Sequence, residues 1–269
     1  MTSNSSADLS IRILSGIKEQ DMARAIFNEV WPSDEGTQIT ANLLQAMVHN
    51  GTYVAGAFVG NEIVAAAFAF PGLDSKKHLH LHSHMAAVKE KYRNRNIGTA
   101  LKLHQKEWAL QRGYDTITWT FDPLVRRNAK LNLVKLGVQV FDYFSDFYGD
   151  LPDALNAGDP TDRLIARWDI ANQNPATKEM DGRGISVALE DHNGEPIQHE
   201  VNPRSSQVLL YLPADIIDLR AKDRALALRW RLAMRNQLQP RLDAGWHISG
   251  FTSDGAYIVT QSPLAEVLK

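Results

Sequence analysis

The chain has 269 residues, of which 44% are hydrophobic and 22% charged, and its formal net charge is −2. This composition indicates a globular protein that can bury one large core and a smaller second one, and it excludes a general electrostatic attraction to nucleic acid or anionic membranes. The sequence has no cysteine, which excludes disulfides, a thiolate nucleophile and cysteine-ligated zinc. The longest apolar run, residues 63–70, is too short to cross a bilayer, and residues 1–8 lack the pattern of a signal peptide. We therefore expect a cytoplasmic protein with a flexible tail at residues 1–8 and with neither a nucleic-acid nor a membrane partner.

In the first part of the chain, the spacing of apolar residues alternates between the period typical of strands and that typical of helices. Two β-rich runs flank Gly60-Asn61, which predicts a hairpin with a two-residue turn. A later helix is expected to end at Gly113, because glycine suits the left-handed residue that follows a helix. The predicted elements are strands at 11–14, 53–58, 62–70 and 78–88 and helices at 19–30, 40–48 and 98–112.

After Gly113 the apolar period changes to two. Ile117, Trp119 and Phe121 alternate with threonines, which predicts a strand with two distinct faces. A helix at 126–136 should end at Gly137, and strands are expected at 138–144 and 163–170.

Residues 171–183 lose the apolar periodicity and are rich in Asn, Pro, Gly and charge, which indicates a linker. Beyond it we expect a strand at 207–212, one long helix from 213 to about 238 and a strand pair within 246–260. The order of elements predicts an α/β (α+β) mixed-sheet domain at residues 1–170, a linker at 171–183 and a small α+β lobe at 184–269. In the lobe, Arg231 and Arg235 share a helix face, which could bind an acceptor carboxylate but more readily indicates a solvated face balanced by aspartates.

The segment between the strand ending near Val88 and the following helix has the features of an anion site. Gly98 and Ala100 are small, so a ligand can approach the backbone, and the first amides of a helix have no intrahelical partner. Arg93 and Arg95 add positive charge beside these amides. The spacing alone is equally compatible with an ordinary helix start that carries solvated arginines.

The run Arg95-Asn96-Ile97-Gly98-Thr99-Ala100 matches the R/Q-x-x-G-x-G/A signature of the GNAT superfamily of acyl-CoA N-acyltransferases. A strand ending in Met85-Ala86-Ala87-Val88 precedes it, and residues 128–138 resemble the family's second helix with its closing glycine, so the resemblance covers about residues 10–170. Residues 118–124 and 146–149 are similar to a branch of the superfamily that has an extra C-terminal lobe.

The resemblance implies an enzyme that transfers an acyl group, acetyl or a larger group such as succinyl, from acyl-CoA to a primary amine of a small molecule such as an amino acid. It implies that the amine attacks the thioester directly, without a covalent enzyme intermediate. Asn128 would contact the cofactor or the acceptor, and a local capping role is its alternative. The sequence leaves two points undecided: whether the protein forms a homodimer, and whether it is instead a coenzyme A sensor or partner-binding protein without activity. By the same resemblance, the pyrophosphate would bind the backbone of Arg93, Arg95, Asn96, Ile97, Gly98, Thr99 and Ala100, and the pantetheine arm would pair with Ala86, Ala87 and Val88.

Histidines at every second position, from His78 to His84, should place their rings on one face of a strand. A general base for the amine, a metal site and an inert polar face are the three interpretations. Ligands about 6.6 Å apart along a strand do not readily share one ion, so we expect no metal. Many relatives carry a carboxylate base on this strand, and the matching position makes His82 the first candidate base and His84 the second. As a histidine, His82 is expected to give a rate dependence at about pH 6 to 8.

The family pattern is broken at Leu133, where many relatives carry a tyrosine that protonates the leaving thiolate. Tyr148 is the candidate replacement, and Tyr143 is a second one. Alternatively, the thiolate of coenzyme A leaves without a protein donor, since a thiol of this kind has a pKa of about 8.5.

Overall fold

A computed structural model describes residues 9–32, 39–149, 159–172 and 179–262. The expected tail at 1–8 and residues 173–178 of the expected linker lie outside these ranges. The chain forms two compact units, residues 1–118 with 170–172 and residues 119–169 with 173–269. Each unit is described by itself. No helix in the described ranges is long and apolar enough to span a membrane.

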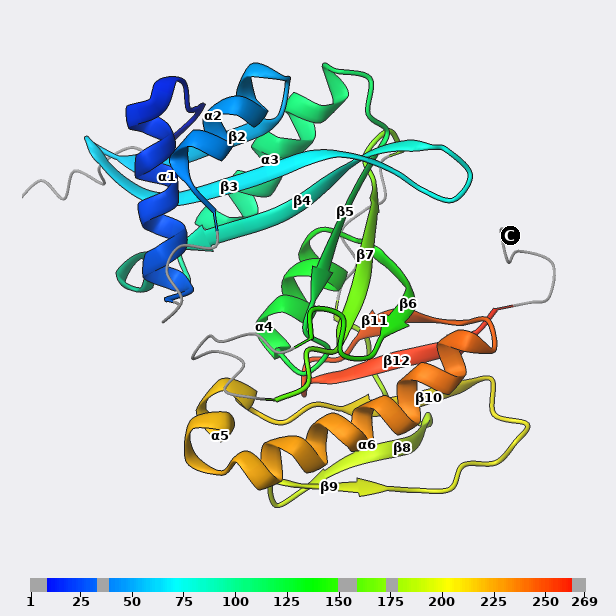
Figure 1. The fold of residues 1–269 in the computed structure, drawn as a ribbon. Helices are drawn as coiled ribbons and strands as arrows, with labels where there is room; N and C mark the ends of the chain where they lie inside the picture. Colours follow the sequence, from blue (N-terminus) through cyan, green and yellow to red (C-terminus); the bar gives the residue numbers. More distant parts are fainter. Residues whose placement is uncertain (1–8, 33–38, 150–158, 173–178, 263–269) are drawn as a thin grey trace, which may run out of the picture. The chain divides into compact units, whose positions relative to one another are not determined.

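The first unit is a largely antiparallel sheet with helices on both faces (Figure 1). Strands β1 to β4 pair in chain order, and β4 continues into a parallel ladder with β5 through Leu81↔Ile117 and His82↔Thr118. The hairpin across Gly60-Asn61 is confirmed. The elements are β1 (Leu9–Ile13), α1 (Gly16–Val30), α2 (Ala41–His49), β2 (Tyr53–Val59), β3 (Glu62–Leu73), β4 (Leu79–Val88), a 3-10 turn (Glu90–Tyr92), α3 (Ile97–Leu110) and the start of β5 (Thr116–Phe121).

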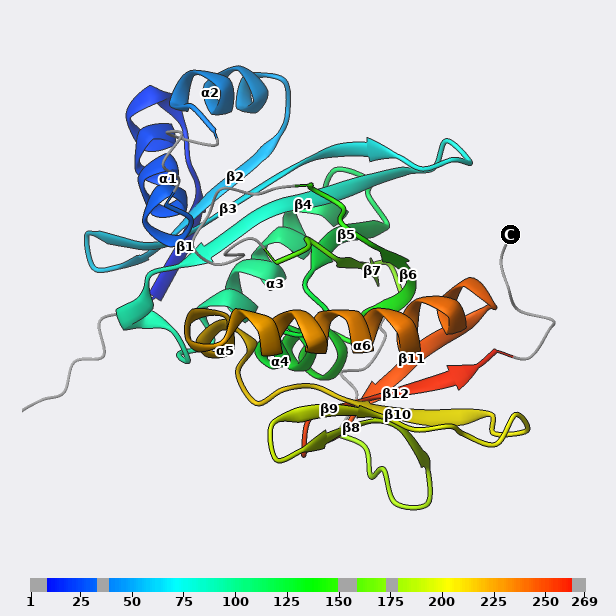
Figure 2. The same ribbon diagram turned by 60° about the horizontal axis from the view of Figure 1, so that its bottom comes forward.

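Alternation along the strands gives this sheet two different buried faces. Phe68 and Met85 pack with Phe27 of α1 and Leu44 of α2 in one apolar cluster. Helix α3 packs on β2, β3 and β4, on the side opposite α1 and α2 (Figure 2). Short side chains on that side let the helix approach the sheet closely; the buried ones at alternate positions are Ala55, Ala57, Ala65, Ala67 and Ala69.

The second unit is built on a sheet in the order β7-β6-β11-β12-β10-β8-β9. Helix α6 lies along one face of it and packs on β6, β8, β9, β10 and β11 (Figures 1 and 2). Val140 of β6 pairs with Ile248 of β11, so segments before and after the expected linker share this sheet. Its elements are the end of β5, α4 (Arg126–Ala129), a π-helical segment (Lys130–Lys135), β6 (Gln139–Phe144), β7 (Arg163–Asp169), β8 (Ser186–His192), β9 (Glu195–Gln198), β10 (Gln207–Tyr211), α5 (Ile216–Lys222), α6 (Arg224–Asp243), β11 (Trp246–Phe251) and β12 (Ala256–Gln261).

The mixed α/β architecture is as predicted, but the single long helix expected from 213 to 238 is wrong. It is two helices, because Asp223 has φ −146° and ψ 88° and its carboxylate accepts the N–H of Leu226, which starts α6 as a new helix. Strands β8 and β9 were not predicted. The domain boundaries at 170 and 184 stay a prediction, because compactness does not decide which segments function separately.

Candidate functional site

The turn entering α3 is held in a conformation that exposes the first amides of the helix. Asn94 and Asn96 have φ of 63° and 59°, and asparagine is among the few residues other than glycine that tolerate this region. The first N–H to bond back within this turn is that of Ala100, which donates to the carbonyl of Asn96 (3.0 Å). The amides of Ile97, Gly98 and Thr99 precede it and lie at the positive end of the helix dipole. A Cβ added at Gly98 would meet no atom within 4 Å, so the space above this backbone is open.

Glu62 of β3 anchors the residues that precede this turn. It accepts hydrogen bonds from the Tyr92 hydroxyl (2.8 Å) and from Lys91 Nζ (2.9 Å). Hydrogen bonds from Lys91 and then Tyr92 lower the pKa of Glu62 to about 2. The Arg95 guanidinium lies 5.3 Å from the centre of the Tyr92 ring. Sequence reasoning did not identify Glu62, because its partners follow it by about 30 residues in the chain.

A bulge in β4 shapes the segment that carries the candidate bases. Phe68 pairs with Met85 and Ala69 with Ser83, so His84 is the extra residue between two ladder pairs. The rings of His82 and His84 are 6.1 Å apart, and both lie against Phe70, at 5.2 and 5.7 Å. The structure therefore brings the two candidate bases together on one face.

The other two histidines are used differently. His78 precedes β4 and pairs with Asp115 (3.0 Å). His80 lies over Gly72, where an added Cβ would come within 2.7 Å of its Nε2 atom. The described ranges contain no group of three or more His, Asp or Glu residues placed to hold a metal ion.

Burial changes the acid–base properties of the candidate bases. His82 Nδ1 lies 3.1 Å from the hydroxyl of Thr118. Burial, with smaller contributions from the positive charges of His84, His80 and Lys102, lowers the pKa of His82 to about 4, and burial also lowers the pKa of His84. His82 is thus neutral at pH 7 and able to accept a proton, but it is a weaker base than its residue type suggests. For a reaction that uses His82 as its base, the expected rate dependence therefore moves from about pH 6 to 8 to about pH 4.

A buried lysine lies on the other face of β4. Lys102 of α3 is 7% exposed, and its Nζ donates to the Ser83 hydroxyl at 2.7 Å. Gln105 Oε1 lies 3.4 Å from the same Nζ. Burial lowers the pKa of Lys102 to about 7. The sequence shows this lysine within an amphipathic helix, where a solvated position is the default, so it was not singled out.

The remaining predicted residues belong to the second unit. The Tyr148 hydroxyl is bonded to Thr120 Oγ1 (2.8 Å) and is partly buried, and Asn128 is partly exposed on α4. Tyr143 donates its hydroxyl proton to buried Asp162, and burial and the Asp162 charge raise its pKa. Its role as a second candidate donor stays a prediction. Leu133 is 4% exposed.

Arg220 and Arg231 of the C-terminal helices do not lie on a solvated face. Arg231 is 0% exposed and donates to both carboxylate oxygens of Asp122 (2.9 and 2.8 Å) and to Asp159 (2.9 Å). Arg220, 4% exposed, joins the same two carboxylates, and Arg235 pairs with Asp162 (2.5 Å). Both interpretations given from the sequence are corrected, because these groups already neutralise one another inside the unit.

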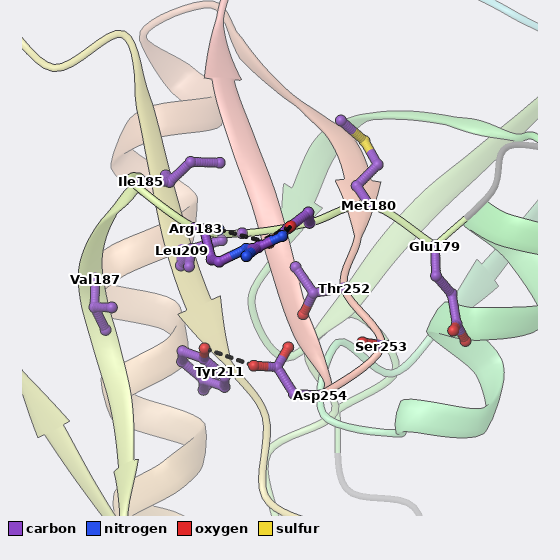
Figure 3. A pocket seen from close by; sticks show the side chains of 12 residues that line it. Glu179, Met180, Arg183, Ile185, Val187, Leu209, Tyr211, Thr252, Ser253 and Asp254 are labelled. Carbon is purple, nitrogen blue, oxygen red and sulfur yellow. Dashed lines mark hydrogen bonds and ion pairs between the residues drawn. The ribbon is translucent and has the colours of Figure 1, made fainter.

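The second unit also contains a cavity of about 600 Å³, shown in Figure 3. Its wall includes apolar side chains such as Leu209 and Ile185. Its charged groups are paired within the unit: the Tyr211 hydroxyl donates to Asp254 (2.9 Å), Arg183 pairs with Asp181 (2.6 Å), and Glu179 pairs with Lys130. The cavity contains none of the predicted site residues and does not indicate a ligand.

Comparison with known proteins gives a family match for the part of the chain that includes α3. The sequence model of the Acetyltransferase (GNAT) family matches residues 20–137. Comparison with curated proteins gives no match.

Many solved structures match, with modest similarity. An acetyltransferase of the GNAT family from Streptococcus pneumoniae is 16% identical, with a TM-score of 0.47, over 60% of this chain and 98% of that one. Arabidopsis thaliana Naa50 in complex with the bisubstrate analogue CoA-Ac-MVNAL is 14% identical, with a TM-score of 0.48, over 59% and 97%. The ribosomal-protein-S18-alanine N-acetyltransferase of Escherichia coli is 16% identical, with a TM-score of 0.47, over 62% and 99%.

Proposed function

We propose that the chain is an acetyltransferase that uses acetyl-CoA, because the Acetyltransferase (GNAT) family model matches residues 20–137, and that its acceptor is the primary amine of a small molecule such as an amino acid. Acetyl is the expected acyl group, and a larger one such as succinyl is the alternative. The reaction forms a C–N bond at the thioester carbonyl and breaks its C–S bond, so the thiolate of coenzyme A leaves with the electron pair.

The start of α3 is the observation that carries the assignment of the donor site. It combines amides that precede the first intrahelical bond, open space above Gly98, and the side chains of Arg93 and Arg95 in the same turn. This arrangement fits a diphosphate, because aligned backbone N–H groups and two guanidinium groups complement its charge. We assign the diphosphate to the backbone from Arg95 to Ala100.

The pantetheine arm is assigned to the end of β4. The ladder with β5 is formed by Leu81 and His82, so Ala86, Ala87 and Val88 lie beyond it along the strand. Ala86 is exposed, whereas Ala87 is 2% exposed and packs into the core. The backbone of this segment can pair with an extended amide-containing ligand as a strand would.

Proton transfer is assigned to the bulged part of β4. His82 accepts the proton that the amine must lose, directly or through water, and His84 is the second candidate. A neutral imidazole is ready to accept throughout the physiological range, because burial lowers its pKa to about 4. Tyr148 is the candidate proton donor to the thiolate, and release of the thiolate to solvent is the alternative.

Thiol release measured with acetyl-CoA across a panel of primary amines tests the acceptor class. Amino acids and other small amines should give turnover, whereas matched alcohols should not. Succinyl-CoA in a parallel series tests the acyl group. Calorimetric binding of coenzyme A without turnover on any amine would contradict the proposed acceptor and favour a coenzyme A sensor.

A further inference from the structure

Beneath β4 lies a buried polar cluster that the proposed reaction does not use. Lys102 Nζ is 2.7 Å from Ser83 Oγ and 3.4 Å from Gln105 Oε1. All three residues are buried, with Gln105 at 0%, Ser83 at 4% and Lys102 at 7% exposed. The amide nitrogen of Gln105 is buried without a partner among the described residues, so the cluster is not fully satisfied. A buried lysine is costly, and an apolar side chain of similar length would fill the same space.

The cluster joins the two parts of the proposed site. Lys102 follows Gly98 by one helical turn on α3, whose first amides face the open space. Ser83 lies between His82 and His84, and it is the last paired residue before the bulge. The hydrogen bond therefore links the donor-binding helix to the strand segment that presents both candidate bases.

We propose that Lys102 is a positioning residue for acyl transfer, which holds the bulged segment of β4 through Ser83 and whose bound proton controls the basicity of His82. This inference rests on the proposed function, because it concerns the same site. Lys102 does not touch the reacting atoms in this proposal, since it acts through Ser83 and through its charge.

The charge of Lys102 is held next to His82, because Lys102 Nζ lies 2.7 Å from the hydroxyl of Ser83, the residue that follows His82 in β4. It is one of the groups that lower the pKa of His82, after burial and the neighbouring histidines. Because burial lowers the pKa of Lys102 to about 7, the charge is present below this pH and absent above it. His82 is therefore expected to be a stronger base once Lys102 has lost its proton. A charged ammonium also makes a stronger hydrogen bond to Ser83 than a neutral amine does.

Three other charged or titratable groups, on the strands β1, β2 and β3 that also pack against α3, have their own partners. They are Arg12 of β1 with Glu19 (2.6 Å), Tyr53 of β2 with His104 of α3 (2.9 Å), and Glu62 of β3 with Lys91 (2.9 Å).

The first test measures proton binding and does not depend on turnover. In the full-length protein labelled with ¹³C and ¹⁵N at lysine and histidine, the Lys102 side-chain signal should titrate near pH 7. The pKa of His82 should rise in Lys102→Met, which keeps the aliphatic stem and removes the charge, and should stay unchanged in the control Lys106→Met on the same helix. An ordinary titration of Lys102 near pH 10.4, or an unchanged His82, would overturn the proposal.

The second test measures turnover with an accepted amine. We expect kcat of Lys102→Met to fall by about tenfold or more with the KM for acetyl-CoA within about threefold, since small misplacements of a reacting group are costly. The wild-type change in kcat near pH 7 should disappear in this variant, and Ser83→Ala should lower kcat but keep the change. Retention of the wild-type pH profile in Lys102→Met would refute the role. If no amine is accepted, the proposed function fails, but the titration of Lys102 and His82 still tests the role of Lys102. If Lys102→Met does not fold, the wild-type titration and the variant Lys102→Arg, which keeps a permanent charge, test that role.

Discussion

Replacing Arg231 by methionine should unfold the second unit far more readily than the same replacement at Arg229, although both residues lie on α6. Arg231 is 0% exposed and makes three charge-assisted hydrogen bonds of 2.8 to 2.9 Å to Asp122 and Asp159. Its removal leaves two buried carboxylates with Arg220 as their remaining shared ion-pair partner among the described residues, and the loss of one partner from such a pair costs about 3–5 kcal/mol. Arg229 pairs with Glu195 at 2.9 Å with both side chains about half exposed, which is worth about 0.2–1 kcal/mol.

Urea unfolding at pH 7, followed by far-UV circular dichroism, measures both losses. The pH dependence of the free energy of unfolding gives a second measure of the same ion-pair network. Burial by itself would raise the pKa of Asp122, but the charges of Arg231 and Arg220 outweigh it and lower the pKa. An aspartate of lowered pKa stabilises the fold above its unfolded pKa of about 3.9, and this stabilisation is lost as the pH falls. In Arg231→Met this loss of stability should begin at a higher pH, because the pKa of Asp122 rises when the Arg231 charge is removed. Equal destabilisation by the two arginine replacements would refute the assignment of Arg231 to a buried, energetically dominant network.

Gly98→Asp should weaken coenzyme A binding about hundredfold by calorimetry, and Gly98→Ala should weaken it less, because the added methyl group meets no protein atom and carries no charge that opposes the diphosphate. Unchanged affinity in Gly98→Asp would remove the donor site from this turn. His82→Ala should lower kcat with little change in donor binding, and the wild-type kcat should fall as the pH drops through about 4, where His82 gains a proton; full activity of the variant would point to water or another base. The lowering of the Lys102 pKa from 10.5 to about 7 corresponds to about 5 kcal/mol. As the pH falls from 10.5 to 7, the free energy of unfolding of the wild type should therefore decrease, and below pH 7 it should no longer change through this group, whereas Lys102→Met should lack this dependence. Parallel curves of unfolding free energy against pH for the two proteins would show that Lys102 is not buried in solution.

Local signals in the sequence predicted most of the first unit. The Gly60-Asn61 turn and the period of two at 116–121 depend on neighbouring residues alone, and the structure confirms them. Helix α3 ends at Leu110, slightly before the predicted end, and Gly113 takes the expected left-handed conformation. The turn before α3 was predicted from its small residues and arginines. Its left-handed Asn94 and Asn96 were not foreseen, although asparagine is a residue type that tolerates this conformation.

Features that depend on distant partners were not predictable in this way. Arg231 lies 109 residues from Asp122 in the chain, so its periodic pattern indicated a polar face where the fold provides a buried carboxylate. Lys102 is buried because a face rich in alanine lies beneath α3, which the composition of the helix does not reveal. The hairpin of β8 and β9 was missed although Asn193-Gly194, both with positive φ, is a turn signal, because its strands are short and polar.

Strand β9 completes the second unit's sheet with only four residues, Glu195–Gln198. Pro196 removes a backbone donor from this outermost strand, and Glu195 places a charge there that is held by Arg229. An edge strand of this kind pairs poorly with a strand of another chain, whereas the adjacent β8, with buried Ala188 and Leu189, would pair well if it formed the edge. Strand β9 thus protects β8 against intermolecular strand addition, and its loss is expected to lead to aggregation even where the first unit still folds.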